Sequence, residues 1–287
     1  MSAAFFRRSA WAAAAVLALA TLSSCSGEST CKMPKGVTIC LTAAEVKNLD
    51  TVHAAGQALL DSPGVTSELL FTPPKGMDGS VPGPLPGTGR YRGDGAEAAV
   101  GGSYEMQFTE DGHTDSARYA GGQTYVRYWR AVDQTGKPAW VAMSQGQLAK
   151  TADEMGTVAW RARAANPLMT ARLLAAFTPG ALDSFTSSGA DGREFHVVMN
   201  SMSMSAAGNS MLTSAFPDHS PNEVTVDLRL DEQKRITWFE VTMKLTHIGG
   251  SGAQIRVMHT FKPADAPVTL GPPEGLLNPP KAAPTGS

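Results

Sequence analysis

Apolar and polar residues alternate along much of this chain, a pattern typical of antiparallel strands that bury one face. In the C-terminal third, an apolar residue stands at every second position over 224–230 and 239–245, and again at 255, 257 and 261. The stretch 65–72 also alternates, with Val65, Ser67, Leu69 and Phe71 on one side. Because successive side chains point to opposite faces, the hairpin that joins the last two stretches must pair residues of matching parity.

Turn signals connect further strands into a meander. Asp111 with Gly112 and Gly121 with Gly122 are typical of tight hairpin turns. Together with the connection over 133–138, they separate four expected strands at 104–108, 113–119, 123–129 and 140–143. A later turn at 191–192 leads into one more strand at 194–199. Most of the chain is therefore expected to form a sheet of antiparallel neighbours.

The first helix is predicted from its start signal. Thr42 and Glu45 have the spacing of a capping box, and apolar residues then repeat at helical spacing as far as Leu60. His53 lies on the apolar side of this helix, and His259 lies on the apolar side of the last strand. Both histidines are expected in the core, with their hydrogen bonds satisfied, and not as ligands.

A second helical section is expected from about residue 147. Asn166 and Pro167 predict the N-cap and first turn of a helix over 168–177. By contrast, the stretch 73–90 holds five prolines and five glycines, which disfavour both a helix and a central strand. This stretch is expected to be a long loop, either a functional lid or disorder.

The N-terminus has the order of a bacterial lipoprotein signal. Arg7 and Arg8 precede an apolar run over 10–20, which is too short to span a bilayer. Residues 22–25, Leu-Ser-Ser-Cys, resemble a lipobox, which predicts cleavage after residue 24 and a lipid anchor on Cys25. A plain secretory signal that ends near a cysteine is the alternative.

Cleavage of residues 1–24 leaves 263 residues, which we interpret as a tether over 25–30, one domain over 31–277 and a disordered tail over 278–287. The net charge changes from −2 to −4 with the loss of two arginines. No basic cluster points to nucleic acid or to electrostatic membrane binding. Attachment to the extracytoplasmic face of the cell membrane would therefore depend on the lipid.

The two remaining cysteines, Cys31 and Cys40, form an even pair in a compartment that permits disulfides. A disulfide between them is predicted, with two free thiols as the alternative. A metal site is less favoured, since two cysteines with no neighbouring histidine supply half of the usual ligands.

No catalytic constellation is found in the sequence. The adjacent acids at 153–154 and 231–232 are expected on solvated turns or helix surface. The methionines over 199–211 suit apolar packing or a flexible rim, with Cu(I) binding as an alternative. The sequence therefore predicts no enzyme, no cofactor and no metal site.

Four segments carry a diffuse resemblance to a known family: 116–127, 136–140, 166–168 and 267–273. They resemble actinobacterial LppX/LprG-type lipoproteins, whose fold is similar to that of the carriers LolA and LolB. The resemblance implies an α+β fold in which a curved antiparallel β-sheet forms an open half-barrel with helices on its concave face. An apolar cavity between sheet and helices would hold lipid acyl chains.

The residues expected to line that cavity come from the apolar strand faces and the methionine-rich loop. They are Leu69, Phe71, Met202, Met204, Phe239, Val241, Met243, Leu245, Ile255 and Val257. Two functions stay open: a membrane-anchored protein that binds or transfers a lipid or glycolipid, and an envelope interaction or sensor lipoprotein with a filled core and a protein partner. A ligand-holding pocket would favour the first, and a filled core with an exposed apolar patch the second.

Overall fold

The computed structural model describes nine segments of the chain: 41–74, 83–93, 102–148, 154–177, 182–189, 191–200, 221–245, 253–264 and 266–277. All of them fall in one of the chain's two compact units, Met33–Ser287. Several predicted features lie outside the described residues: the signal peptide, Cys25, the Cys31 and Cys40 pair, the methionine-rich loop from residue 201 onward and the C-terminal tail. They remain predictions from the sequence.

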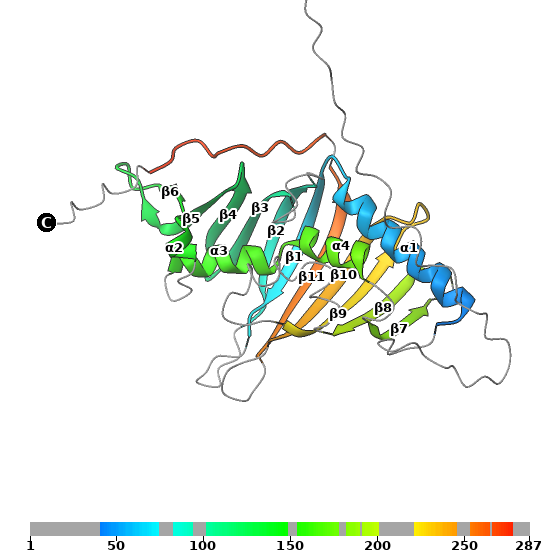
Figure 1. Ribbon diagram of the computed structural model, residues 1–287. Helices are drawn as coiled ribbons and strands as arrows, with labels where there is room; N and C mark the ends of the chain where they lie inside the picture. Colours follow the sequence, from blue (N-terminus) through cyan, green and yellow to red (C-terminus); the bar gives the residue numbers. More distant parts are fainter. Residues whose placement is uncertain are drawn as a thin grey trace, which may run out of the picture. The chain divides into compact units, whose positions relative to one another are not determined.

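The described strands form one antiparallel sheet (Figure 1). Its members are β1 (Val65–Thr72), β2 (Leu85–Arg92), β3 (Ser103–Glu110), β4 (His113–Ala120), β5 (Gln123–Val132), β6 (Pro138–Ala142), β7 (Leu182–Ser188), β8 (Glu194–Asn200), β9 (Pro221–Leu230), β10 (Ile236–Leu245) and β11 (Ala253–Pro263). Their order is β6-β5-β4-β3-β2-β1-β11-β10-β9-β8-β7. Two sequential meanders are thus joined where the first strand pairs with the last.

The register confirms the predicted parity of the apolar faces. Val241 pairs with Val257 across β10 and β11, and Val257 pairs with Phe71 across β11 and β1. Buried side chains alternate with half-buried or exposed ones along β9, β10 and β11. The sheet therefore has one apolar face and one polar face, as the alternating sequence predicts.

The described helices pack on the apolar face of the sheet. They are α1 (Ala43–Leu60), α2 (Gln145–Leu148), α3 (Glu154–Ala164) and α4 (Pro167–Ala176). The capping box of α1 and the Asn166 N-cap of α4 are both formed as predicted. Figure 1 shows these helices crossing in front of the strands, and α3 lies against β4 and β5 while α1 lies against β7 and β10.

Helices α1 and α4 approach closely at a glycine. A Cβ atom at Gly56 would lie 2.7 Å from the carbonyl oxygen of Ala171 and 2.9 Å from the backbone nitrogen of Ala175. Both are backbone atoms, so neither can move aside without shifting the helix. Glycine at this position is what allows the two helix backbones to meet.

The prediction of a long loop over 73–90 is wrong for the last third of this stretch. Residues from Leu85 onward form β2, a central strand between β1 and β3. Pro86 lies opposite Leu70 at the end of β2, before the pairing with β3 begins at Gly87, so its missing N–H costs little there. At Gly89, a Cβ atom would collide with the Tyr91 hydroxyl, so the glycine permits this strand and does not break it.

A C-terminal strap, residues 266–277, follows β11 and runs along one end of the strands to β6 (Figure 1). Its first contact is a hydrogen bond from the Val268 N–H to the Pro63 carbonyl, 3.1 Å long. Its last contacts are a parallel bridge between Leu276 and Trp140 and a 2.8 Å bond from the Leu277 N–H to the Trp140 carbonyl. The strap connects the centre of the sheet to its β6 edge.

Candidate functional site

Eight of the ten residues predicted to line a cavity come together on the apolar face of the sheet. They are Leu69, Phe71, Phe239, Val241, Met243, Leu245, Ile255 and Val257, and each is 5% exposed or less. Met202 and Met204 lie outside the described residues. The sequence therefore predicted residues that form one contiguous apolar surface on β1, β10 and β11. Ligand binding by this surface stays a prediction.

A buried polar network lies on this same face of the sheet, where His259 stands in register with Leu69 and Phe239. The Nε2 atom of His259 donates to the Ala165 carbonyl oxygen at 2.9 Å, and Nδ1 lies 3.0 Å from the Ser67 hydroxyl. Because a carbonyl oxygen can only accept, the neutral ring must accept at Nδ1, so Ser67 donates to it. The Tyr91 hydroxyl, 3.1 Å from Ser67 Oγ, then donates to Ser67. The donor or acceptor role of each group in the network is thus fixed.

This network confirms His259 as a satisfied core residue. The ring is fully buried, and the loss of hydration lowers its pKa to about 3, so it stays uncharged at neutral pH. Ser67 and His259 have the spacing of a nucleophile and a base, but Ser67 is only 4% exposed. A substrate would have no access to the pair, so we assign it to packing.

His53 fits its prediction less well. Its ring packs edge-on against Phe177 with centroids 4.6 Å apart, and burial is the main cause that lowers its pKa. Its Nε2 atom, however, has no hydrogen-bond partner among the described residues. The histidine lies in the core as expected, but its hydrogen bonds are satisfied only in part.

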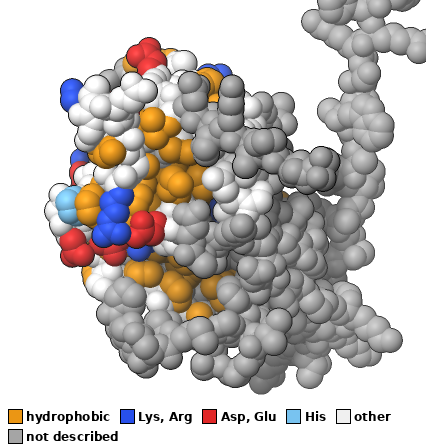
Figure 2. All heavy atoms as spheres, turned by 90° about the vertical axis from the view of Figure 1, so that its left-hand side faces the viewer, with side chains coloured by type: hydrophobic (Ala, Val, Ile, Leu, Met, Phe, Trp, Pro, Cys, Tyr) orange, Lys and Arg blue, Asp and Glu red, His pale blue; other side chains and the backbone are white. Residues whose placement is uncertain are grey.

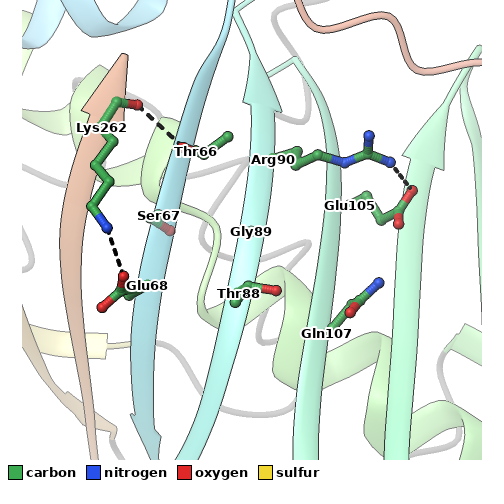
Figure 3. A pocket seen from close by; sticks show the side chains of 9 residues that line it. All are labelled: Thr66, Ser67, Glu68, Thr88, Gly89, Arg90, Glu105, Gln107 and Lys262. Atoms are coloured by element: carbon green, nitrogen blue, oxygen red, sulfur yellow. Dashed lines mark hydrogen bonds and ion pairs between the residues drawn. The ribbon is translucent and has the colours of Figure 1, made fainter. Parts of the chain in front are cut away.

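The polar face of the sheet carries an open trough of about 300 Å³ across β11, β1, β2 and β3. Its lining residues are Thr66, Ser67, Glu68, Thr88, Gly89, Arg90, Glu105, Gln107 and Lys262. Figure 3 shows Lys262 and Glu68 on one side, Arg90, Glu105 and Gln107 on the other, and the small residue Thr88 between them. Short side chains between long charged ones leave the hollow.

Ion pairs form both walls of the trough. Lys262 Nζ lies 2.7 Å from Glu68 Oε1, and this pair lowers the pKa of the Glu68 carboxyl. On the opposite wall, Glu105 Oε2 accepts from Arg90 at 3.0 Å and from Arg118 Nε at 2.7 Å. Arg118 also donates to the carbonyl of Gly271 in the C-terminal strap. Glu105 is thus shared between two guanidinium groups.

The trough was not predicted from the sequence. Arg90 fell in the stretch interpreted as a loop, so its pairing with Glu105 could not be foreseen. Lys262 and Glu68 are nearly two hundred positions apart and meet only because β1 pairs with β11. The available signal was the polar side of each alternating strand, which gives a face but no neighbours.

A different apolar surface appears at the β6 edge of the sheet. Figure 2 shows this side of the molecule, with apolar side chains gathered in its middle and charged ones beside them. Among the described residues, the large apolar side chains that are most exposed are Val132 and Leu276, at 47% and 43%. They belong to β5 and the C-terminal strap.

In the described segments, His, Cys, Asp and Glu side chains form no group of three or more that could hold a metal ion. In the same segments, no helix has both the length and the apolar character needed to span a membrane.

Comparisons with known proteins give weak similarities. No family model matches the chain, and no curated protein matches it. A DUF1329 family protein from Desulfovibrio piger aligns with a TM-score of 0.32 at 9% identity, over 78% of this chain and 94% of its own. A putative outer membrane lipoprotein-sorting protein domain from Vibrio parahaemolyticus aligns with a TM-score of 0.31 at 8% identity, over 76% and 92%. At these TM-scores, neither similarity establishes a function for this protein.

Proposed function

We propose that this protein is an extracytoplasmic lipoprotein that binds or transfers an apolar ligand, such as lipid acyl chains, between its sheet and its helices. The lipid on Cys25 would anchor it to the cell membrane, and the helices would lie on the concave side of a half-barrel. The anchor would keep the domain within reach of its cargo, because the five residues that follow Cys25 in the tether, 26–30, extend about 17 Å at most.

The observation that supports this proposal is the wide apolar face of a single open sheet. Phe71, Ile255 and Val257 lie at its centre, on β1 and β11; each is 2% exposed or less, and the Trp160 ring of α3 packs edge-on against Phe71. This apolar layer between sheet and helices is the surface that acyl chains would line if the helices moved away from the sheet. Acyl chains would then replace side-chain contacts without requiring specific hydrogen bonds.

An acyl-binding measurement tests the proposal. The full chain, stripped of copurifying lipid and confirmed to be folded, should bind a fluorescent acyl probe with a saturable increase in emission. Replacing Met202 and Met204 together by Asp should weaken binding at least tenfold with little change in melting temperature, since charge at a wet entrance repels acyl chains.

Met258→Asp provides the control, because Met258 lies on the polar face of β11. This variant should bind the probe like the wild type. A folded, delipidated wild-type protein that showed no saturable probe binding would overturn the carrier function.

A second candidate function is an envelope interaction or sensor protein with a filled core. It is favoured by the burial of the eight predicted cavity residues, which are 5% exposed or less without any ligand. Mass spectrometry of solvent extracts separates the two functions: a carrier should copurify with stoichiometric lipid, whereas a filled core should yield none.

A further inference from the structure

The trough on the polar face has an excess of positive charge along one row of the sheet. The strand pairings define this row: five residues on neighbouring strands stand side by side, in the order Lys262, Thr66, Arg90, Glu105 and Arg118. Three cations therefore share this row with one carboxylate. The neighbouring row contributes one more acid, Glu68, so the five charged groups around the trough sum to one positive charge, whereas the whole chain carries −2.

The existing ion pairs leave this charge available to a ligand. A single carboxylate oxygen of Glu105 serves both Arg90 and Arg118, so it cannot neutralise both guanidinium groups. The side chains of Lys262 and Glu68 are 64% and 69% exposed, and an ion pair so open to water exchanges partners readily. Arg90, with 52% of its side chain exposed, can present its unused N–H groups to the trough.

The geometry favours a compact ligand that can accept hydrogen bonds from both sides of the trough. Lys262 and Arg90 stand on β11 and β2, two strands apart, so their backbones are separated by about 10 Å. Thr66 lies between them in the same row, and Thr88 and Gln107 offer further hydrogen bonds in the next row. A phosphate group has three acceptor oxygens in a tetrahedral arrangement, and guanidinium and ammonium groups are its usual partners.

We propose that this trough is a binding site for a compact phosphate-bearing ligand, held between Lys262 and Arg90 above Thr66. The phosphate can come from a soluble metabolite or from the headgroup of an anionic lipid, since both present the same oxygens. This site lies on the face opposite the proposed acyl site, and it does not depend on that function.

Calorimetric titration of the full chain with inorganic phosphate tests the site directly. Wild-type protein should bind with a Kd of about 1 mM or tighter, and binding should weaken as the salt concentration rises. The double variant Arg90→Gln, Lys262→Gln should bind at least tenfold more weakly. Glu105 keeps its bond to Arg118 in this variant, so the sheet should remain folded.

Lys244→Gln is the matched control. Lys244 also forms a cross-strand ion pair on the polar face, 2.6 Å from Glu223, with 53% of its side chain exposed, but it lies outside the trough. This variant should bind phosphate like the wild type. If phosphate binding weakened equally in the control and in the double variant, the cause would be general surface charge, and the site would be overturned. Wild-type protein that gave no saturable heat on titration with phosphate would also overturn it.

Vesicle sedimentation distinguishes the two sources of phosphate. The measurement uses protein without the predicted lipid on Cys25, since an acyl anchor would insert into any bilayer. If this protein binds phosphate in solution and sediments with phosphatidylglycerol vesicles but not with phosphatidylcholine vesicles, the ligand is a lipid headgroup, provided that the double variant in the same form does not sediment. Binding of free phosphate without vesicle binding would support the site and assign it to a soluble ligand. Vesicle binding that the double variant retains would contradict the trough as the membrane contact.

Discussion

Acidification from pH 7 to pH 4 should lower the free energy of unfolding substantially, and His259 should be a main cause. In the folded protein, burial lowers the pKa of this ring to about 3, whereas in the unfolded chain it returns to about 6.5. Between these values the unfolded chain binds a proton that the folded protein excludes, so stability falls as the pH falls. The full effect of this one group is roughly 5 kcal/mol.

The variant His259→Phe isolates this contribution. It leaves the Ala165 carbonyl without its donor, which should cost about 1–3 kcal/mol at pH 7. It also removes the titrating group, so urea unfolding at several pH values should show about 3 kcal/mol less loss between pH 7 and pH 4 than in the wild type.

His113→Phe is the control, because His113 is exposed and stacks on Trp129 at 4.0 Å, where phenylalanine can replace it. Its pH profile should follow the wild type. A comparison between variants is needed because protonation of carboxylates such as Glu68, whose pKa is lowered in the folded protein, also reduces the free energy of unfolding on acidification. Equal pH slopes for His259→Phe and wild type would show that the buried imidazole is not the cause.

Gly56→Ala should destabilise the protein by about 2–4 kcal/mol, although alanine is the better helix former by about 1 kcal/mol. The new methyl group would lie 2.7 Å from the Ala171 carbonyl oxygen and 3.0 Å from the Cβ of Leu174. Relief requires α1 and α4 to separate, which opens the core beneath both helices. Thermal unfolding followed by circular dichroism measures the change as a drop in melting temperature.

The matched control is Gly146→Ala in α2, where a new Cβ would have no neighbour within 4 Å. Helix propensity alone should act there, so the melting temperature should stay the same or rise slightly. A Gly56→Ala protein as stable as the wild type would mean that α1 and α4 do not pack as closely as described.

The sequence predicts local structure in this protein because its signals are local. Turn residues such as Gly121 and Gly122 and the period-two alternation on either side fix the hairpins, and the Thr42 capping box fixes the start of α1. The burial of His259 also follows from its place on an apolar strand side. These features depend on residues within a few positions of each other.

The features that the sequence did not predict depend on distant neighbours. Strand β2 was missed because proline and glycine usually end strands. Pro86 is tolerated because it has no partner on β3, and Gly89 is required because the Tyr91 side chain occupies the space of a Cβ atom. The trough and the bond from Ser67 to His259 both require β1 beside β11, a pairing that no local pattern specifies.

The strand order has a consequence for how the chain reaches this structure. Strands β1 to β6 and strands β7 to β11 each pair with sequence neighbours, so each group can assemble through short loop closures. The seam between β1 and β11 instead joins residues such as Ser67 and Phe261, and closing so large a loop has a high entropic cost before any contact is gained. Nucleation is therefore expected within the two meanders, and the pairing of β1 with β11 is expected to be the last and slowest step of folding.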